Sequence, residues 1–340
     1  MLSPTLDELP SPPPQKKGWP WTEAGTAQIR ADPSERPWPR VTVVTPSLNQ
    51  GQYIEEAIRS VLLQGYPDLE YIVMDGGSTD ATVEVIRKYE RWIAHWVSEP
   101  DAGQSQAINS GWARGSGKVL AYLNSDDAYL EDAIFSGVQA LQATAEAGMA
   151  YGTAVVVDEA GRELRRWEAK PFSLRAMLLD GNVVPQAAAF YTRRSLDTVG
   201  YLANDLEMIM DYELSLRVGL AFPSVCIPRM LARFRDHPRS KSRNQFATTG
   251  RELVNLVKKL STDPLTAREV GALRQASLSR IHYEWALSCI AHDQRDGSTG
   301  RHLRESLRLH PAYAMGRPIQ TAYILKEILR EVSATQTRPI

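Results

Sequence analysis

The chain has 340 residues, of which 43% are hydrophobic, and a formal net charge of -1 at pH 7. This length is enough to bury one large core or two ordinary ones, so we expect one main folded domain with an extension. The near-neutral charge disfavours nucleic-acid binding through bulk charge, and no nucleic-acid partner is expected. Only Cys226 and Cys289 occur, without CxxC spacing. A disulfide framework or zinc knuckle is therefore not expected, and a reducing cytoplasm fits best.

The N-terminal segment, residues 1–39, is rich in proline, since nine of the 21 prolines fall within residues 1–40. It lacks the apolar stretch of a signal peptide, and no run of 18 apolar residues occurs in the sequence. Its composition predicts an extended or disordered extension. We expect Trp19, Trp21 and Trp38 to pack this extension onto the surface of the protein.

Strand-like and helix-like patterns alternate after residue 40. Short β-branched or apolar runs predict strands at 41–45, 70–74, 93–97 and 118–123. Between the first two strands, apolar residues recur at helical spacing: Ile54, Ile58, Val61 and Leu62. A turn through DGGSTD leads into the next helix, with Ser78 or Thr79 as its expected N-cap. The alternation predicts an α/β fold with βαβ units and a mostly parallel sheet.

Polar residues follow each of the four predicted strands. They are Thr45, Ser47 and Asn49 after the first, Asp75 after the second, Asp101 and Gln104 after the third, and Asn124, Asp126 and Asp127 after the fourth. In open α/β sheets, ligands bind beyond the carboxyl ends of the strands. Any one of these residues alone would more often start a turn or cap a helix. Their recurrence after four strands indicates a ligand site.

Two common nucleotide-binding motifs are missing, and their absence excludes two kinds of ligand site. The first strand is followed by TPSLNQGQY, which is not the GxGxxG of a dinucleotide fold, and GWARGSGKVL does not have the spacing of a phosphate loop. We interpret the second segment as a helix end that leads into the fourth strand. The adjacent carboxylates Asp126 and Asp127 suit a hard divalent cation, Mn2+ or Mg2+, that bridges a substrate diphosphate.

Two long segments carry a family resemblance. VTVVTPSLNQGQYIEEAIRSVLLQGYPDLEYIVMDGGSTDAT and EPDAGQSQAINSGWARGSGKVLAYLNSDDAY resemble glycosyltransferase family 2, over about residues 40–240. The resemblance implies the GT-A fold, a nucleotide-sugar donor and a divalent metal. It assigns the nucleotide to Thr45, Pro46, Ser47, Asn49 and Asp75. It also places Asp126 near the ribose and the metal, and Asp127 on the metal. Asn124 stands where many relatives have an aspartate, and its amide can bond the ribose without adding charge.

The second half is expected to supply the acceptor site and the catalytic base. The segment 151–167 predicts a hairpin with its turn near 159–161, and 186–191 predicts a further strand. MDYELSLRVGL resembles the family's catalytic helix, which implies that Asp211 is the general base, although Met210 replaces the usual glutamate. The alternative is that Asp211 only stabilises a helix N-terminus.

The segment 229–245, RMLARFRDHPRSKSRNQ, is strongly basic. We expect a loop whose cations neutralise the leaving diphosphate. Within it, His237 resembles a histidine that helps to hold metal or phosphate in some relatives, and an ordinary surface histidine is the alternative.

The expected function is an inverting transfer of a sugar from a UDP-, GDP- or dTDP-sugar to a glycan or lipid-linked acceptor of the cell envelope. Two other classes are weighed against it. A nucleotidyltransferase would need a Gly-rich loop that is missing here, and a non-catalytic GT-A-like module that binds nucleotide or glycan would not need Asp75, Asp127 and Asp211. Processive synthases are disfavoured because no QxxRW follows Asp211.

The expected domains are the extension 1–39, a GT-A domain at 40–245 and a helical region at 246–340. The last helix carries an apolar stripe, Leu325, Ile328, Leu329 and Val332, beside Lys326 and Arg330. We expect the stripe to pack on the body of the protein or on a second copy in a homodimer. A peripheral contact with the inner face of the membrane is the alternative.

Overall fold

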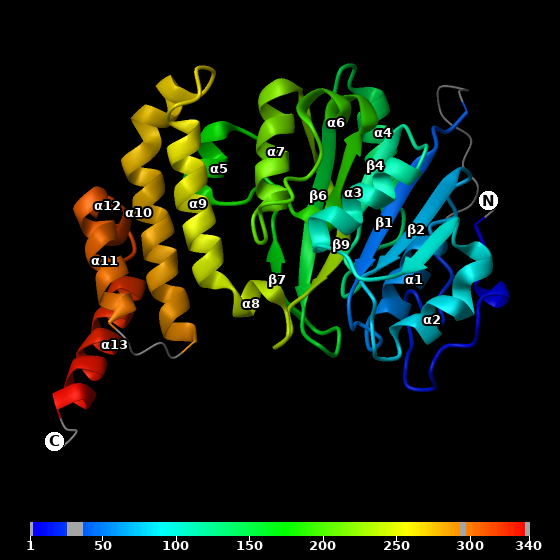
Figure 1. Ribbon diagram of the computed structural model, residues 1–340, viewed down its shortest axis with the longest axis horizontal. Helices are drawn as coiled ribbons and strands as arrows, with labels where there is room; N and C mark the ends of the chain where they lie inside the picture. The colour runs from blue at the N-terminus through cyan, green and yellow to red at the C-terminus, as the bar shows by residue number, and fades with distance from the viewer. Residues whose placement is uncertain (1–2, 26–36, 293–296, 337–340) are drawn as a thin grey trace. The chain divides into compact units, whose positions relative to one another are not determined.

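The structure of the protein is a computed structural model that describes residues 3–25, 37–292 and 297–336 (Figure 1). The chain forms two compact units. The first consists of residues 1–174 with 182–237, and the second of 175–181 with 238–340. The three-part division at residues 39 and 245 stays a prediction.

The first unit is built on a mixed sheet. Its strands are β1 (Val41–Ser47), β2 (Leu69–Asp75), β3 (His95–Ser98), β4 (Val119–Tyr122), β5 (Ala128–Tyr129), β6 (Met149–Val157), β7 (Glu163–Trp167), β8 (Ala189–Thr192) and β9 (Ser224–Arg235). The order is β3-β2-β1-β4-β8-β6-β9-β5, and β7 pairs with β6. The pairs β3-β2, β2-β1 and β1-β4 are parallel, whereas β8 runs antiparallel to β4 and β6. The chain reverses its direction of travel across the sheet at β1, which makes the β1/β4 edge the switch point where α/β sheets bind ligands.

Helices cover both faces of this sheet (Figure 1). They are α1 (Ile54–Leu62), α2 (Thr82–Tyr89), α3 (Gln104–Arg114), α4 (Ala133–Ala143), α6 (Arg193–Val199) and α7 (Met210–Ala221). Alternate strand residues point to opposite faces. Val43 joins the core cluster that includes α1 and α4, whereas Val44 faces α3. A Cβ on Gly111 would lie 2.6 Å from Val44 Cγ1, so glycine lets α3 approach β1 closely.

The elements match the predictions with four differences. The third strand begins at His95, two residues later than expected. Helix α2 begins at Thr82 with Ala81 at the N-cap position, so the prediction that Ser78 or Thr79 caps this helix is wrong. Residues 186–188 form the 3-10 helix η3 (Gln186–Ala188) before β8. Residues 229–235 are the end of strand β9 and not a loop, because they pair with β6 and β5. The 151–167 hairpin is confirmed as β6 and β7.

The described part of the N-terminal segment is packed and includes the short 3-10 helix η1 (Leu6–Glu8). The predicted packing of Trp19, Trp21 and Trp38 is confirmed, since all three are buried. The indole N–H of Trp19 donates a hydrogen bond to the carbonyl of Tyr129. The fully buried guanidinium of Arg59 on α1 donates to three carbonyls of this segment. Residues 26–36 of the predicted extension lie outside the described residues.

The second unit is helical, as predicted. Its elements are α8 (Lys241–Asn244), α9 (Phe246–Leu260), α10 (Ala267–Ala291), α11 (Ser298–Leu309), α12 (Pro311–Met315) and α13 (Pro318–Gln336), together with most of α5 (Leu174–Asp180). Its core contains Tyr283, Ala286, Leu303, Ala314 and Ile324. In the described parts of the chain, every helix is too short or too polar to cross a bilayer.

The predicted packing of the α13 stripe is only partly right. Ile328 packs against the core of the second unit, but Leu325 and Leu329 are exposed. Ile324, which the predicted stripe omits, is fully buried instead. The stripe is therefore rotated toward Ile324, and two of its leucines face outward.

The contact between α10 and α11 should make the second unit sensitive to acid. His282 Nδ1 lies 2.9 Å from His302 Nδ1, and burial lowers the pKa of His282 against the opposing effect of nearby Glu305. A histidine whose pKa is lowered by folding stabilises the fold above its unfolded-state pKa, and this stability is lost as the pH falls. We expect the melting temperature to fall between pH 7 and pH 5, and to fall less in His282→Gln. The exposed His95 provides the control, and an equal change in His95→Gln would contradict the assignment.

Candidate active site

The carboxyl ends of β1, β2 and β3 bring three polar side chains into one row. Ser47 is in register with Asp75, and Asp75 is in register with Ser98. Parallel pairing places all three side chains beyond the same edge of the sheet. The row depends on the three strands together and cannot be read from any one strand alone. This row and the end of β4 form the rim of the site.

Asp75 is a buried carboxylate that the surrounding loops hold firmly. Its Oδ2 accepts hydrogen bonds from the Ser98 hydroxyl at 2.6 Å and from the Ser78 backbone N–H at 2.9 Å. The Ser78 hydroxyl donates to Oδ1 at 2.5 Å. Ser78 therefore orders the turn after β2 through Asp75, which explains why it does not cap α2.

The residues after β1 divide into buried and exposed groups. Thr45 and Pro46 are buried, and Thr45 Oγ1 accepts a hydrogen bond from Tyr71. Ser47 Oγ is buried and has no hydrogen-bond partner within the described structure. Asn49 is exposed with a positive φ of 54°, and its Oδ1 accepts from the Thr79 backbone N–H. Asn49 thus connects the loop after β1 to the loop after β2.

Asp101, Gln104 and Asn124 connect α3 to the end of β4. The exposed Asp101 accepts a hydrogen bond from the Gly103 backbone N–H just before the helix. Gln104 Nε2 donates to Asn124 Oδ1 at 2.7 Å. The amide of Asn124 lies 3.3 Å from both Asp127 Oδ2 and Gln186 Oε1. The amide network therefore reaches from α3 to the paired carboxylates.

Asp126 and Asp127 occupy different environments although they are adjacent. Asp126 is partly exposed, and its Oδ2 lies 3.1 Å from Nε2 of the buried His237. Asp127 is buried, and its Oδ1 accepts from the Arg235 backbone N–H at 2.9 Å. Burial, and next the charge of Asp126, raise the pKa of Asp127 well above its usual value. The structure thus brings the predicted pair and His237 together.

Arg235 lies buried beneath this pair. Its Nε donates to the Asp126 carbonyl, and its NH1 donates to the carbonyls of Asp158 and Glu159 in the β6-β7 turn. Its NH2 forms a 3.0 Å ion pair with the buried Glu56 of α1. One guanidinium therefore connects the carboxylate loop, the hairpin and a helix. Its donors are occupied by these partners, which does not support the expected role of Arg235 at the leaving diphosphate.

Two other arginines of the basic segment also have protein partners. Arg233 lies 3.5 Å from Glu56 and donates to the Trp19 carbonyl. Arg229 donates to Ser136 Oγ. The expectation that these side chains neutralise a diphosphate is therefore not supported by their positions.

Asp211 lies in the first turn of α7, as predicted. Burial raises its pKa to about 6, while backbone N–H groups of the helix start and the Asn182 amide act in the opposite direction. Asn182 Nδ2 donates to Asp211 Oδ2 at 3.0 Å. Asp211 is thus a carboxylate that is ionised at neutral pH and more basic than an ordinary aspartate.

Tyr122 at the end of β4 connects the two carboxylate groups. Burial raises the pKa of Tyr122, and the charges of Asp211 and Asp127 act in the same direction. The Tyr122 carbonyl accepts from Gln186 Nε2, which belongs to the same network as Asn124. Asp211 and the Asp126-Asp127 pair therefore belong to one site around the end of β4.

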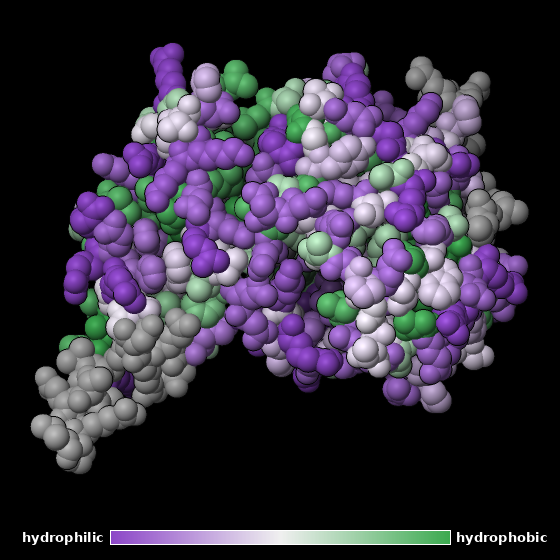
Figure 2. Space-filling view, viewed as in Figure 1, coloured by the Kyte–Doolittle hydropathy of each residue, from purple (hydrophilic) through white to green (hydrophobic). Residues whose placement is uncertain are grey.

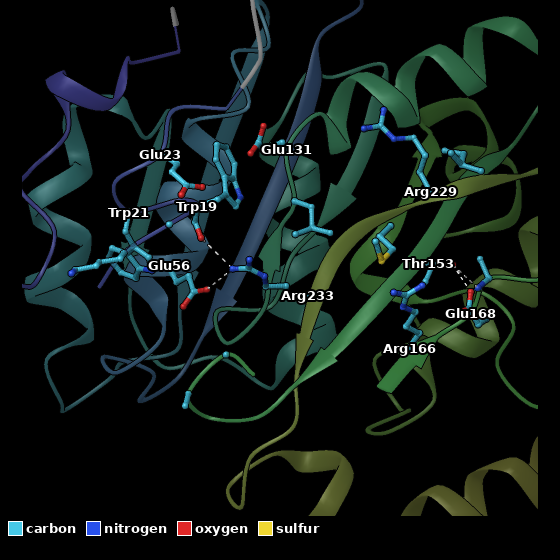
Figure 3. Close-up of a pocket in the computed structure, with 18 of the residues that line it drawn as sticks. Trp19, Trp21, Glu23, Glu56, Glu131, Thr153, Arg166, Glu168, Arg229 and Arg233 are labelled. Carbon is cyan, nitrogen blue, oxygen red and sulfur yellow. Dashed lines mark hydrogen bonds and ion pairs between the residues drawn. The ribbon is translucent and has the colours of Figure 1, made fainter. Parts of the chain in front are cut away.

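A separate cavity of about 1200 Å³ opens in the first unit (Figure 3). Its walls include parts of the N-terminal segment, α1, β6, β7 and β9, and among the lining residues are Trp19, Glu56, Arg233, Thr153 and Glu168. The close-up shows Arg233 bonded to Glu56 and to the Trp19 backbone, and Thr153 bonded to Glu168. Asp75, Asp126, Asp127 and Asp211 are absent from its described lining. The carboxylates of the rim therefore belong to a different site.

Several residues of the site were missed by reasoning from the sequence. They are Glu56, Asn182, Gln186, Ser78, Ser98 and the structural role of Arg235. Asn182 and Gln186 precede β8 in a segment rich in polar and small residues, which was the available signal. Nothing in the local pattern could indicate that Arg235 and Glu56, far apart in sequence, pair in the core.

Comparison with known proteins now identifies the class. The profile described as "Glycosyl transferase family 2" matches residues 42–199. An uncharacterized glycosyltransferase of Mycobacterium tuberculosis is 33% identical over 198 residues, which are 58% of this chain and 75% of the relative. The putative teichuronic acid biosynthesis glycosyltransferase TuaG of Bacillus subtilis is 38% identical over 97 residues, which are 28% of this chain and 38% of TuaG.

Solved structures agree on the fold. S. aureus TarS 1–349 in complex with UDP-GlcNAc aligns with a TM-score of 0.56 at 14% identity, over 86% of this chain and 89% of that 1–349 chain. The mannosyltransferase PcManGT of Pyrobaculum calidifontis, in complex with GDP-Man and Mn2+, aligns with a TM-score of 0.56 at 19% identity, over 88% and 90%. The fold is similar to that of these glycosyltransferase structures. The chain belongs to glycosyltransferase family 2, as its motifs predict.

Replacing the buried guanidinium should destabilise the first unit strongly. Arg235→Met would leave Glu56 with weaker partners and three carbonyls without their donor, so we expect a loss of about 3–5 kcal/mol in the free energy of unfolding. Arg229 on the same strand is half-exposed, and Arg229→Met should cost less than about 1 kcal/mol. Chemical denaturation measures both. Equal losses would show that Arg235 has no special structural role.

Proposed function

We propose that this glycosyltransferase moves a sugar from a nucleoside-diphosphate donor, a UDP-, GDP- or dTDP-sugar, to a glycan or lipid-linked acceptor with inversion at the anomeric carbon. The observation that carries the proposal is that Asp211 and the Asp126-Asp127 pair contact one short segment, 182–186: Asn182 donates to Asp211, and Gln186 contacts Asn124, which contacts Asp127. Such a transfer needs a site that stabilises the leaving diphosphate and a carboxylate nearby that accepts the proton of the acceptor hydroxyl. The ligands named for TarS and PcManGT, UDP-GlcNAc and GDP-Man, support the donor class, and the teichuronic acid biosynthesis named for TuaG supports a glycan acceptor.

We assign the nucleotide to the rim formed by the first three strand ends. The loops after β1 and β2 are fixed to each other by Asn49, and Asp75 is held in place by two serines. Ser47 Oγ is buried without a partner, which costs free energy unless a ligand satisfies it. A polar atom of the base or ribose would provide this partner. Asp101, Gln104 and Asn124 would complete the nucleotide site on the α3 side.

The carboxylate pair fits a divalent cation, Mn2+ or Mg2+. Asp126 and Asp127 are adjacent carboxylates, and the pKa of Asp127 stays raised although the Arg235 charge acts in the opposite direction. Carboxylate oxygens are the ligands that hard cations prefer. Within the described residues, no three His, Cys, Asp or Glu side chains already converge as a metal site. Asp127 and Asp126 would hold the ion, with His237 positioning Asp126 or adding a ligand. A bound cation would supply charge that stabilises the departing diphosphate.

Asp211 is assigned as the general base. A carboxyl group with a pKa of about 6 is ionised at neutral pH yet accepts a proton more readily than an exposed aspartate. The Asn182 amide fixes one carboxylate oxygen, so that the other can face an acceptor hydroxyl. As the hydroxyl oxygen attacks the anomeric carbon, its proton passes to Asp211 and the bond to the diphosphate breaks on the opposite face. The helix-start role of Asp211 is compatible with this, because its backbone contacts remain.

The donor assignment can be tested by ligand-induced stabilisation. We expect UDP, GDP or dTDP, one of them most strongly, to raise the melting temperature in the presence of Mn2+. A ligand at about 100 times its dissociation constant stabilises the fold by about 2.7 kcal/mol. Asp127→Asn should remove the part of the shift that depends on Mn2+. The control is Asp68→Asn, which alters a surface aspartate paired with Arg40. No shift with any nucleotide would contradict the proposal and favour a module that binds glycan only.

The base assignment predicts a change in both activity and stability. Asp211→Asn should retain the nucleotide-induced shift but lower transfer by at least about 100-fold, because a general base typically contributes 10²–10⁴-fold. Since folding raises the pKa of Asp211, the stability that this carboxyl group contributes to the first unit is lost as the pH rises through about 6, and Asp211→Asn should lack this loss. Denaturation at pH 5 and pH 8 therefore confirms that the variant is folded.

The role of Asn182 can be separated from that of Asp211. kcat/KM should rise with pH through about 6, and Asn182→Ala should move this rise to higher pH because a hydrogen bond to the carboxylate is lost. Asn204→Ala changes an exposed asparagine bonded to Asn109 and should leave the profile unchanged. A pH profile that is identical in Asn182→Ala and the wild-type protein would remove Asp211 from the titrating step.

A further inference from the structure

We propose that the outer face of α13 in the second unit docks onto an anionic lipid surface. The docking face consists of Ile319, Tyr323, Leu325 and Leu329, with Lys326 and Arg330 between them. The inference concerns a part of the chain outside the carboxylate site. It does not depend on the identity of the donor.

The first observation is that charge is divided unequally along the chain. Residues 238–340 contain 17 lysines and arginines but nine acidic residues, whereas residues 1–237 contain 22 basic and 31 acidic residues. The near-zero net charge of the whole chain thus conceals a basic C-terminal part and an acidic N-terminal part. Hydrophilic residues cover much of the C-terminal helices in the space-filling view, with hydrophobic ones between them (Figure 2). A charge asymmetry of this size is typical of binding to an anionic surface.

The second observation is the exposure of large apolar side chains on α13. One side of the helix is anchored, because Ile324 is buried and Ile328 packs against the core of the unit. The other side exposes Ile319 by 83%, Leu329 by 67% and Tyr323 by 49%. Burying such side chains in an apolar medium is favourable by the hydrophobic effect. The outer face is therefore available for an apolar partner.

The third observation is the position of the cations on this face. A shallow groove on α13 is lined by Ala322, Leu325, Lys326, Leu329 and Arg330. Positions 322, 326, 329 and 330 follow helical spacing, so the apolar and cationic side chains share one side of the helix. Arg330 is also paired with Glu327, which orients it at the edge of the groove.

A lipid surface accounts for these observations better than a second copy of the chain. A helix with apolar and basic side chains can lie in the plane of the interface, with its apolar residues in the acyl boundary and its cations among the headgroups. Anionic headgroups attract basic residues within a Debye length of the surface. Two copies of this face would instead bring Lys326 and Arg330 toward like charges. Docking would also bring the enzyme close to a lipid-linked acceptor, a consequence that does rest on the proposed function.

The test is co-sedimentation of the full chain with vesicles of phosphatidylcholine, with and without phosphatidylglycerol. We expect binding only to the anionic vesicles, and weaker binding at high salt because salt screens the attraction. The double variant Leu325→Glu/Leu329→Glu should abolish binding, and Lys326→Glu/Arg330→Glu should reduce it at least tenfold. These side chains are exposed, so circular dichroism should show unchanged folding.

Leu265 provides the matched control, because it is a leucine of the same unit that is 95% exposed and lies outside α13. Leu265→Glu should bind anionic vesicles as the wild-type protein does. The proposal is wrong if no vesicle binds, or if the α13 variants bind as well as the control. It is also wrong if the leucine variants instead dissociate a dimer seen by light scattering, which would assign the face to a second copy. Nucleotide-induced stabilisation of the same variants tests the donor site separately.

Discussion

The buried guanidinium of Arg235 connects the parts of the first unit that surround the candidate site. Its hydrogen bonds join the Asp126 loop, the β6-β7 turn and Glu56 of α1, while its backbone N–H binds Asp127. A charge in the core is costly unless every donor is satisfied, and here the partners come from three separate elements. The same contacts that compensate the buried charge therefore fix the position of the carboxylate pair.

The candidate site contains groups whose burial costs folding free energy. Burial raises the pKa of both Asp127 and Asp211, and Ser47 Oγ has no partner in the described structure. Each of these features costs stability in the free protein and can be relieved by a cation, a proton or a ligand. Buried groups with shifted pKa values or unmet hydrogen bonds are typical of a site that binds a charged, polar substrate.

The two units differ in charge and in exposed apolar surface, and the composition of the whole chain does not show this difference. The sheet unit carries the carboxylates and most of the acidic residues, whereas the helical unit carries a surplus of basic residues and exposed apolar side chains on α13. Neighbouring positions of the same helix differ sharply, since Ile324 is buried and Leu325 is exposed. The helical period separates a side that stabilises the unit from a side that can bind something else.

The sequence by itself determined the class of fold, the first four strands to within two residues and the family, because alternating periodicity and the polar residues after each strand are local properties of the chain. It also indicated Asp126, Asp127 and Asp211. Only the tertiary structure showed that Arg235 belongs to the core and that Asn182 contacts Asp211, because these pairings join residues remote in sequence. It likewise decided which leucines of α13 face outward. Burial and hydrogen-bond partners depend on what packs against a residue, and a local pattern does not contain that information.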